Sequence, residues 1–320
     1  MVRDINVYIE PNSNGTLDFH PGHLLKGMVE YPLDHVENIH CFSVTVVGKA
    51  EVIWQKNESI RERSGDTVTI EHFDVNYWGT EYSLNEETYL MGVKKGPLIT
   101  LQPGVYRYNF SCQLPQNLPS SFSGKFGEIS YCVESNIDLE NRYRICFGHT
   151  PFNVIRIDDL NLYPELRSTF KLEKVKSFCF IFCTGSLVMT VTTPCTGFAI
   201  GQSVPIKIEY LNKSSVDVKH TKVTLKRTVR FTCQHPKTET KKFDDIIISV
   251  VAQGVKARQS DRIESILEIP MNLACSNDRY CRIVNIKYSV DIEGELSMFH
   301  SNPKISIPIT IGNFQARPVF

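Results

Sequence analysis

Four cysteines of this sequence come closest to a metal site. Three residues separate Cys179 from Cys183, and five separate Cys275 from Cys281. A structural zinc ion takes four ligands in two close pairs, each with about two to five residues between its members. The spacings here are loose for a zinc ribbon, and the two pairs lie far apart in the chain. We therefore expect these cysteines to lie in a buried strand and a loop, with no metal and no cofactor.

Cys179 and Cys183 have a second possible chemistry, which is acylation at a membrane. Their neighbours Phe178, Phe180 and Phe182 are apolar, and such a segment suits a lipid-modified cysteine and a buried core equally well. Acylation of these two cysteines stays open as an alternative to simple burial.

The other cysteines and the histidines give weaker signals. His20 and His23 flank a Pro-Gly turn, and two imidazoles are too few ligands for a metal. The cysteines inside strand-like runs are expected to be buried and reduced, and they are Cys41, Cys112, Cys132, Cys146 and Cys233. A thiol-dependent redox protein remains a rival interpretation of the ten cysteines.

The short motifs of catalysis are missing from the chain. It contains no Gly-x-Ser-x-Gly, no His-Glu-x-x-His, no phosphate-binding loop and no dinucleotide fingerprint. We therefore expect a protein that is not an enzyme.

A basic stripe is the most distinctive candidate for binding. A strand is expected from Lys222 to Phe231, with its apolar side chains at odd positions. Lys222, Lys226 and Arg230 then share the solvent face, and Lys219 precedes them. Such a stripe could receive an acidic or phosphorylated tail, or anionic lipid headgroups. The alternative is a solvated strand face whose lysines prevent edge pairing.

Arg227 falls on the apolar face of the same strand. A buried arginine needs a carboxylate partner, because an unpaired buried charge costs several kcal/mol. A β-bulge that turns Arg227 outward is the other possibility.

Composition and charge exclude several classes of protein. Lys+Arg 35 balances Asp+Glu 35, so the excess of basic charge typical of a nucleic-acid binder is missing. The first residues carry no apolar signal-peptide core, and the best apolar run, Phe178 to Val191, is too short and too interrupted to cross a membrane. We expect a cytoplasmic protein.

Hydrophobic alternation with a period of two dominates the sequence. It extends from Phe42 to Trp54, from Val204 to Tyr210, from Val284 to Ile292 and from Ile305 to Ile311. Short alternating strands between turn residues are typical of antiparallel β-sandwiches, which bury one face of each sheet. The chain is therefore predicted to be all-β.

The expected domain boundary lies in a charged stretch without alternation. We predict a first sandwich over residues 1–160, a linker over 161–176, a second sandwich over 177–315 and a short tail at 316–320. A length of 320 residues agrees with two domains.

Specific segments resemble the arrestin-domain-containing, or α-arrestin, family. They are LDFHPGHLLKGMVEY from Leu17, FSVTVVGKAEVIW from Phe42, and PGVYRYNFSCQLPQNLPSSFSGKFGEISYCVES from Pro103. The second half matches more loosely, through GSLVMTVTTPCTGFAIGQSVPIKIEYLNKSS and the closing IPITIG. The resemblance implies two tandem arrestin-type, immunoglobulin-like sandwiches.

The resemblance also implies a function. Members of the family are adaptors that bring HECT-type ubiquitin ligases to membrane receptors or transporters for endocytic sorting, and they bind through strand edges, loops and concave faces. The expected localisation is cytoplasmic, with peripheral recruitment to the plasma membrane or endosomes. In visual and β-arrestins a buried charged cluster holds the two domains together, so Arg227 is a candidate for an interdomain charge contact. A retromer-type trafficking coat subunit is a related alternative.

Two family features are missing here. The family recruits ligases through Pro-Pro-x-Tyr motifs read by WW domains, yet no two prolines are adjacent in this sequence. We expect a short member that recruits ligases indirectly or not at all, and the alternative is a member that binds them through a tail missing from this sequence. A relative that binds thioredoxin uses a cysteine in the second domain, whereas the matching stretch here, Ile248 to Gly254, has none.

Overall fold

The fold is known from a computed structural model. It describes residues 5–64, 67–140, 142–180, 183–277, 279–296 and 300–314, and for 62–64, 67–69, 142–147, 179–180 and 183–184 it describes the backbone alone. Within these ranges the chain forms β-strands and two short 3₁₀ segments, with no α-helix. The all-β prediction is confirmed.

The chain divides into two compact units. The first contains Met1–Arg156 together with Phe231–Lys241 and Arg279–Val284, and the second contains the remaining residues. Each unit is built on a pair of β-sheets, as the prediction of tandem β-sandwiches requires.

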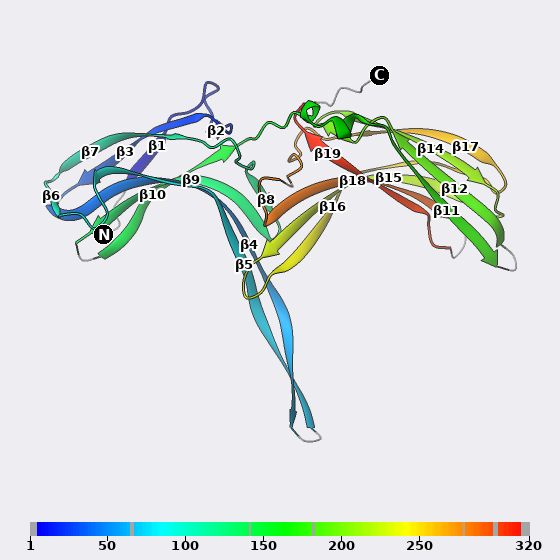
Figure 1. The fold of residues 1–320 in the computed structure, drawn as a ribbon, viewed down its shortest axis with the longest axis horizontal. Helices are drawn as coiled ribbons and strands as arrows, with labels where there is room; N and C mark the ends of the chain where they lie inside the picture. The colour runs from blue at the N-terminus through cyan, green and yellow to red at the C-terminus, as the bar shows by residue number, and fades with distance from the viewer. Residues whose placement is uncertain are drawn as a thin grey trace. The chain divides into compact units, whose positions relative to one another are not determined.

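The first unit has one small and one large sheet (Figure 1). The small sheet has the order β1-β3-β7, from strands β1 (Asn6–Ile9), β3 (Leu24–Leu33) and β7 (Gly104–Gln113). The large sheet has the order β2-β10-β9-β4-β5, from β2 (Asp18–Phe19), β10 (Arg142–Val154), β9 (Gly127–Leu139), β4 (Glu37–Ser64) and β5 (Thr67–Gly92). Two short strands complete it, with β6 (Ile99–Leu101) beside β4 and β8 (Phe122–Gly124) beside β9.

The second unit repeats this plan. Its four-stranded sheet has the order β11-β12-β14-β17, from β11 (Phe170–Phe180), β12 (Cys183–Thr193), β14 (Ser203–Asn212) and β17 (Ser260–Glu268). Its five-stranded sheet has the order β13-β19-β18-β15-β16, from β13 (Gly197–Ala199), β19 (Lys304–Gly312), β18 (Val284–Leu296), β15 (Val218–Cys233) and β16 (Glu239–Val255).

Pairing is antiparallel with two exceptions among the described pairs. The two-residue strand β2 runs parallel to β10, and the three-residue strand β13 runs parallel to β19. Both are short edge strands, so the antiparallel prediction holds for the sheets as wholes.

The predicted alternation produces the cores. In β14 and β19 every second side chain is buried, from Val204 to Tyr210 and from Ile305 to Ile311. Tyr31, Phe42 and Ile129 are almost fully buried in the first unit. Because successive strand residues point to opposite faces, this period of two gives each sheet one apolar face.

The predicted linker is only partly a linker. Residues 161–176 include the end of the 3₁₀ segment η1 (Leu160–Leu162), all of a second one, η2 (Pro164–Arg167), and then the first seven residues of β11. Phe170–Lys176 therefore belong to the second sheet pair, and the division between units falls earlier, after Arg156. The sequence does not predict this strand, because it lies at a sheet edge, where both faces are partly exposed and can carry charged residues. The tail at 316–320 lies outside the described residues.

One hairpin of the first unit extends far beyond its sheet (Figure 1). Strand β9 pairs with β4 only as far as Val52, whereas β5 continues to pair with β4 out to Ser64. Trp78 of β5, opposite Ile53, still forms a β-bridge with His235. Beyond this pair, the described main-chain pairing of β4 and β5 is with each other alone, so their outer parts form a two-stranded ribbon.

Candidate functional site

Strand β15 presents the predicted basic stripe. Lys222 and Arg230 are exposed and Lys226 is half-buried, whereas Val223, Leu225 and Val229 between them are buried. Lys219, near the start of the strand, is exposed as well. The predicted alternation holds at the two ends of the segment, whereas Thr224 in its middle is also buried and residues 226–228 are all half-buried.

The cations of the stripe differ in their partners. The Nζ of Lys226 lies 3.5 Å from Asp244 and 3.9 Å from Asp291, so its charge is compensated. Lys219, Lys222 and Arg230 make no ion pair within the described part of the chain. The free positive charge of the stripe therefore comes from these three residues.

Asp291 on β18 organises the surface next to Lys226. Its side chain is 6% exposed, accepts hydrogen bonds from Ser289 and Ser306, and lies 2.9 Å from the Nζ of Lys304. Burial alone would raise the pKa of Asp291, but the donors around it lower that pKa below its usual value. This carboxylate is ionised at neutral pH and holds two lysines on the face of the sheet.

Arg227 lies on the opposite face of β15. Its Nη2 and Nε lie 2.7 Å and 3.2 Å from Oδ2 of Asp245 on β16. Burial, the largest single influence, would lower the pKa of Arg227, but the hydrogen bond with Asp245 and the interactions with Tyr288 and the Asp245 charge together raise it. The sequence left open whether Arg227 has a carboxylate partner or is turned outward by a β-bulge. The carboxylate partner is present, and it belongs to the same unit as Arg227. An interdomain contact of Arg227 stays a prediction.

The cysteines singled out by the sequence do not form a described cluster. Cys179 and Cys183 lie at the facing ends of β11 and β12, and their side chains are outside the described residues. Among the residues that are described, no group of three or more His, Cys, Asp and Glu side chains could hold a metal ion. The His20 and His23 rings contact each other, and Nδ1 of His20 lies 2.6 Å from the Ile155 carbonyl oxygen.

Burial makes five of the described thiols poor nucleophiles. It raises the pKa of Cys41 to about 11, of Cys112 to about 12 and of Cys275 to about 11. The pKa of Cys195 and of Cys281 is raised for the same reason. At neutral pH these groups are protonated thiols.

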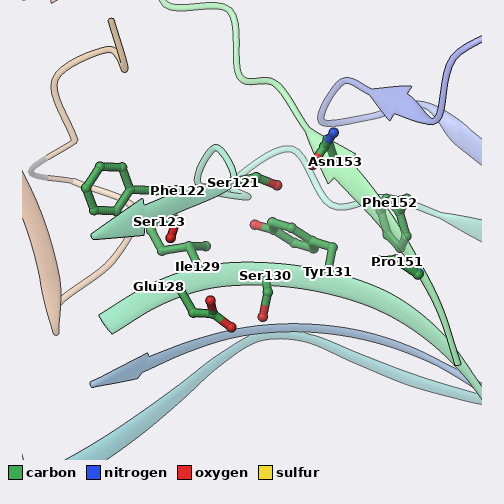
Figure 2. Close-up of a pocket in the computed structure, with 10 residues that line it drawn as sticks. All are labelled: Ser121, Phe122, Ser123, Glu128, Ile129, Ser130, Tyr131, Pro151, Phe152 and Asn153. Atoms are coloured by element: carbon green, nitrogen blue, oxygen red, sulfur yellow. The ribbon is translucent and has the colours of Figure 1, made fainter. Parts of the chain in front are cut away.

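A shallow groove of about 340 Å³ lies in the large sheet of the first unit (Figure 2). Strands β8 and β10 pair end to end with the same edge of β9, and Ser130 lies at the gap between them. Figure 2 shows Glu128 and Ser130 pointing away from Tyr131, on the other side of β9. The Tyr131 hydroxyl donates to the Pro119 carbonyl oxygen at 2.6 Å.

The gap between β8 and β10 leaves no main-chain hydrogen-bonding group of Ser130 unpaired. Ile53 N donates to Phe126 O at 2.9 Å, so even-numbered residues of this part of β9 hydrogen-bond to β4. The main chain of Ser130 therefore bonds to Lys49 and does not point into the gap.

No pattern in the sequence predicts the groove, because it depends on where two distant strands end. Its polar and aromatic side chains do not converge, so it offers no evident chemistry.

Comparison with known proteins identifies the family. Residues 6–161 match the N-terminal domain, and residues 183–316 the C-terminal domain, of Arrestin (or S-antigen). The chain is 24% identical over 302 residues to Arrestin domain-containing protein 1 of Rattus norvegicus, which covers 94% of this chain and 63% of the relative. The chain is an α-arrestin.

Other relatives agree with this assignment. Arrestin domain-containing protein 4 of Mus musculus is 26% identical over 215 residues, which is 67% of this chain and 50% of the relative. Arrestin domain-containing protein 17 of Caenorhabditis elegans is 25% identical over 225 residues, which is 67% of this chain and 49% of the relative. The chain thus spans between about half and 63% of the length of these relatives.

The α-arrestin family is one of trafficking adaptors that bind cargo and other proteins, and its members are generally not catalytic. No helix in the described part of this α-arrestin has the length and apolar character needed to cross a membrane.

Proposed function

We propose that this α-arrestin is a non-catalytic adaptor that links membrane-protein cargo to endocytic sorting and ubiquitination. In this proposal it is a cytoplasmic protein recruited peripherally to the plasma membrane or endosomes. Its β15 stripe receives the acidic or phosphorylated tails of receptors or transporters. The observation that carries the proposal is the set of exposed cations without ion-pair partners in the described part of the chain, with Lys222 and Arg230 on one face of β15 and Lys219 near the start of the strand.

The spacing of these cations favours an extended tail. Lys222 and Arg230 are eight residues apart on one strand, which corresponds to roughly 27 Å. That separation is too large for both cations to contact one phosphate group. An extended peptide with acidic residues along its length matches it, and the contacts would weaken with salt.

The high thiol pKa values support the non-catalytic part of the proposal. A thiol-dependent enzyme or redox protein needs an accessible thiolate, and burial disfavours that form at Cys41, Cys112 and Cys275.

We also propose that these 320 residues themselves recruit a HECT-type ligase only indirectly. No Pro-Pro-x-Tyr occurs within these 320 residues, so a WW domain has no such motif to read in them. A pull-down of this chain with isolated WW domains should recover no direct complex, and a direct complex would contradict indirect recruitment.

The test of cargo binding uses two double variants with equal changes in charge. Lys222→Glu with Arg230→Glu alters the stripe, and Lys171→Glu with Lys174→Glu alters exposed lysines of β11 in the same unit. Fluorescence anisotropy with an acidic tail peptide, phosphorylated and not, measures affinity at low salt. We expect the stripe variant to lose tenfold or more and the β11 variant to bind like the wild type.

Two results would contradict this role of the stripe. Unchanged binding by the stripe variant would show that the peptide binds elsewhere. An equal loss in both variants would show that only net charge matters. Circular dichroism should confirm that both variants keep their β-sheet content.

A further inference from the structure

Strand β16 is an edge strand with an unusually apolar segment. It ends the order β13-β19-β18-β15-β16, and no described strand pairs with its outer side. The ten residues from Ile246 to Val255, IIISVVAQGV, contain no charged side chain. An exposed edge presents unpaired N–H and C=O groups, and an uncharged apolar edge is a template for another strand.

The other edges of the same unit are protected. Strand β13, at the opposite edge of the same sheet, is uncharged but only three residues long and buried. Strand β17 carries Asp261, Arg262 and Glu264 beside its exposed Ile266, and β11 carries lysines and glutamate along most of its length. Charged side chains are a common device that keeps edge strands from pairing. The contrast singles out β16 as the edge that this unit leaves open.

Both faces of β16 are partly exposed and apolar. Ile246 and Val251 are each 65% exposed on one face, whereas Ile247, Ile248 and Val250 are half-buried. Exposed and half-buried side chains alternate along β16, except that Ile247 and Ile248 are both half-buried, as expected for a β-bulge. A strand added to this edge must therefore be apolar on both of its own faces.

We propose that β16 pairs with β16 of a second copy of this chain, in an antiparallel arrangement about a two-fold axis at Ser249. A two-fold axis perpendicular to the sheet keeps each face continuous across the dimer. Counting Ile248 as the extra residue of the bulge, this register places Ile246 opposite Val251 of the other copy on one face. It places Ile247 opposite Val250 of the other copy on the other face.

The same register avoids charge conflict. Asp244 lies opposite Gln253 of the other copy, and Asp245 lies opposite Ala252, so no like charges face each other across the paired segment. β-branched pairs stabilise cross-strand contacts, and pairing from Phe243 to Gly254 would form about ten main-chain hydrogen bonds. A second copy meets the apolar requirement on both faces because it supplies the same residues.

The experiment compares matched lysine substitutions at two edges. Ile246→Lys alters β16, and Ile266→Lys alters β17 at a residue of the same type that is 63% exposed. Sedimentation velocity over a range of protein concentrations measures the dimer dissociation constant of the full chain. We expect a concentration-dependent dimer in the wild type and in Ile266→Lys, and at least a tenfold higher dissociation constant in Ile246→Lys.

A compensating variant tests the register itself. In the double variant Ile246→Lys with Val251→Glu, the lysine of each copy faces the glutamate of the other copy. The two pairs of opposite charges should restore most of the dimer. Hydrogen exchange should show protection of the β16 amides that increases with protein concentration in the wild type. This second measurement needs no substitution, so it applies even if a variant folds poorly.

Several outcomes would overturn the proposal. A wild-type chain that stays monomeric at all concentrations, without added protection of β16, excludes the pairing. A dimer that dissociates equally in Ile246→Lys and Ile266→Lys would use another surface. A dimer that is unaffected by Ile246→Lys would likewise exclude pairing through this edge.

Discussion

Arg227 on β15 donates two hydrogen bonds to one carboxylate oxygen of Asp245 on the neighbouring strand β16. The two side chains are 25% and 26% exposed, so the ion pair is neither fully buried nor freely solvated. The ion pair compensates the charge of Arg227, which lies on the core-facing side of β15. The other residues on that side, Val223, Leu225 and Val229, are buried.

The first prediction concerns this ion pair. Arg227→Met should lower the stability of the second unit by about 1–2 kcal/mol, because it removes two charge-assisted hydrogen bonds from the partly buried Asp245. The thermal unfolding midpoint measures the loss. Arg230→Met is the control on the same strand and should have little effect, because Arg230 makes no ion pair in the described part of the chain. Equal shifts for the two variants would contradict this account.

The second prediction concerns pH and Asp291. Its folded pKa lies below the usual value of 3.8, so it contributes stability that is fully present above that value. This stability is lost as the pH falls through the lowered folded pKa. The wild type should therefore exceed Asp291→Asn in stability at pH 6, and the difference should shrink steadily below about pH 4. Chemical denaturation at several pH values measures it, and a difference that is constant with pH would contradict the prediction.

Much of the fold follows from local alternation. The buried faces of β14, β18 and β19 can be predicted from the sequence because each strand has one apolar face toward its core. The turn bracketed by Gly124 and Gly127 can also be predicted from its residues, and these glycines pair at the ends of β8 and β9.

Features that depend on distant pairing cannot be predicted in this way. The sequence marks Lys226 as a cation on a solvent face, but its neutralisation by Asp291 requires β18 to lie beside β15. The sequence predicts a linker where Phe170–Lys176 form a strand, because an edge strand can carry charges on both faces. The uncharged run of β16 is visible in the sequence, whereas its position at a sheet edge is not.

The third prediction concerns the close approach of β15 and β16 at Gly254. A Cβ atom at this position would collide with the main-chain carbonyl of Val218. Gly254→Ala must therefore push the two strands apart, and we expect a loss of about 2 kcal/mol. Gly104→Ala on β7 is the control, because its Cβ would meet no described atom within 4 Å. Thermal unfolding should separate the two variants, and an equally stable Gly254→Ala would show that the strands can adjust freely.

The last prediction concerns the ribbon formed by the outer parts of β4 and β5. Its pairs beyond Ile60 and Glu71 join only the two strands to each other, and Ile60 and Ile70 are about half exposed. Isolated two-stranded hairpins are marginally stable, so this part should contribute little to the folding of the first unit. Replacing residues 61–70 by Asn-Gly, which favours a tight hairpin turn, should leave the thermal midpoint within a few degrees of the wild type.

A deeper truncation provides the contrast. Joining Val52 to Gly79 through the same turn also removes Trp54 and Tyr77, whose rings stack at 5.9 Å and are buried in the first unit. Losing two large buried aromatic side chains should cost several kcal/mol, so this variant should unfold at a clearly lower temperature. If the short truncation were as damaging as the deep one, the outer ribbon would have to stabilise the sheet from which it extends. Hydrogen exchange in the wild type should agree, with faster exchange beyond Ile60 than at the pairs between β4 and β9.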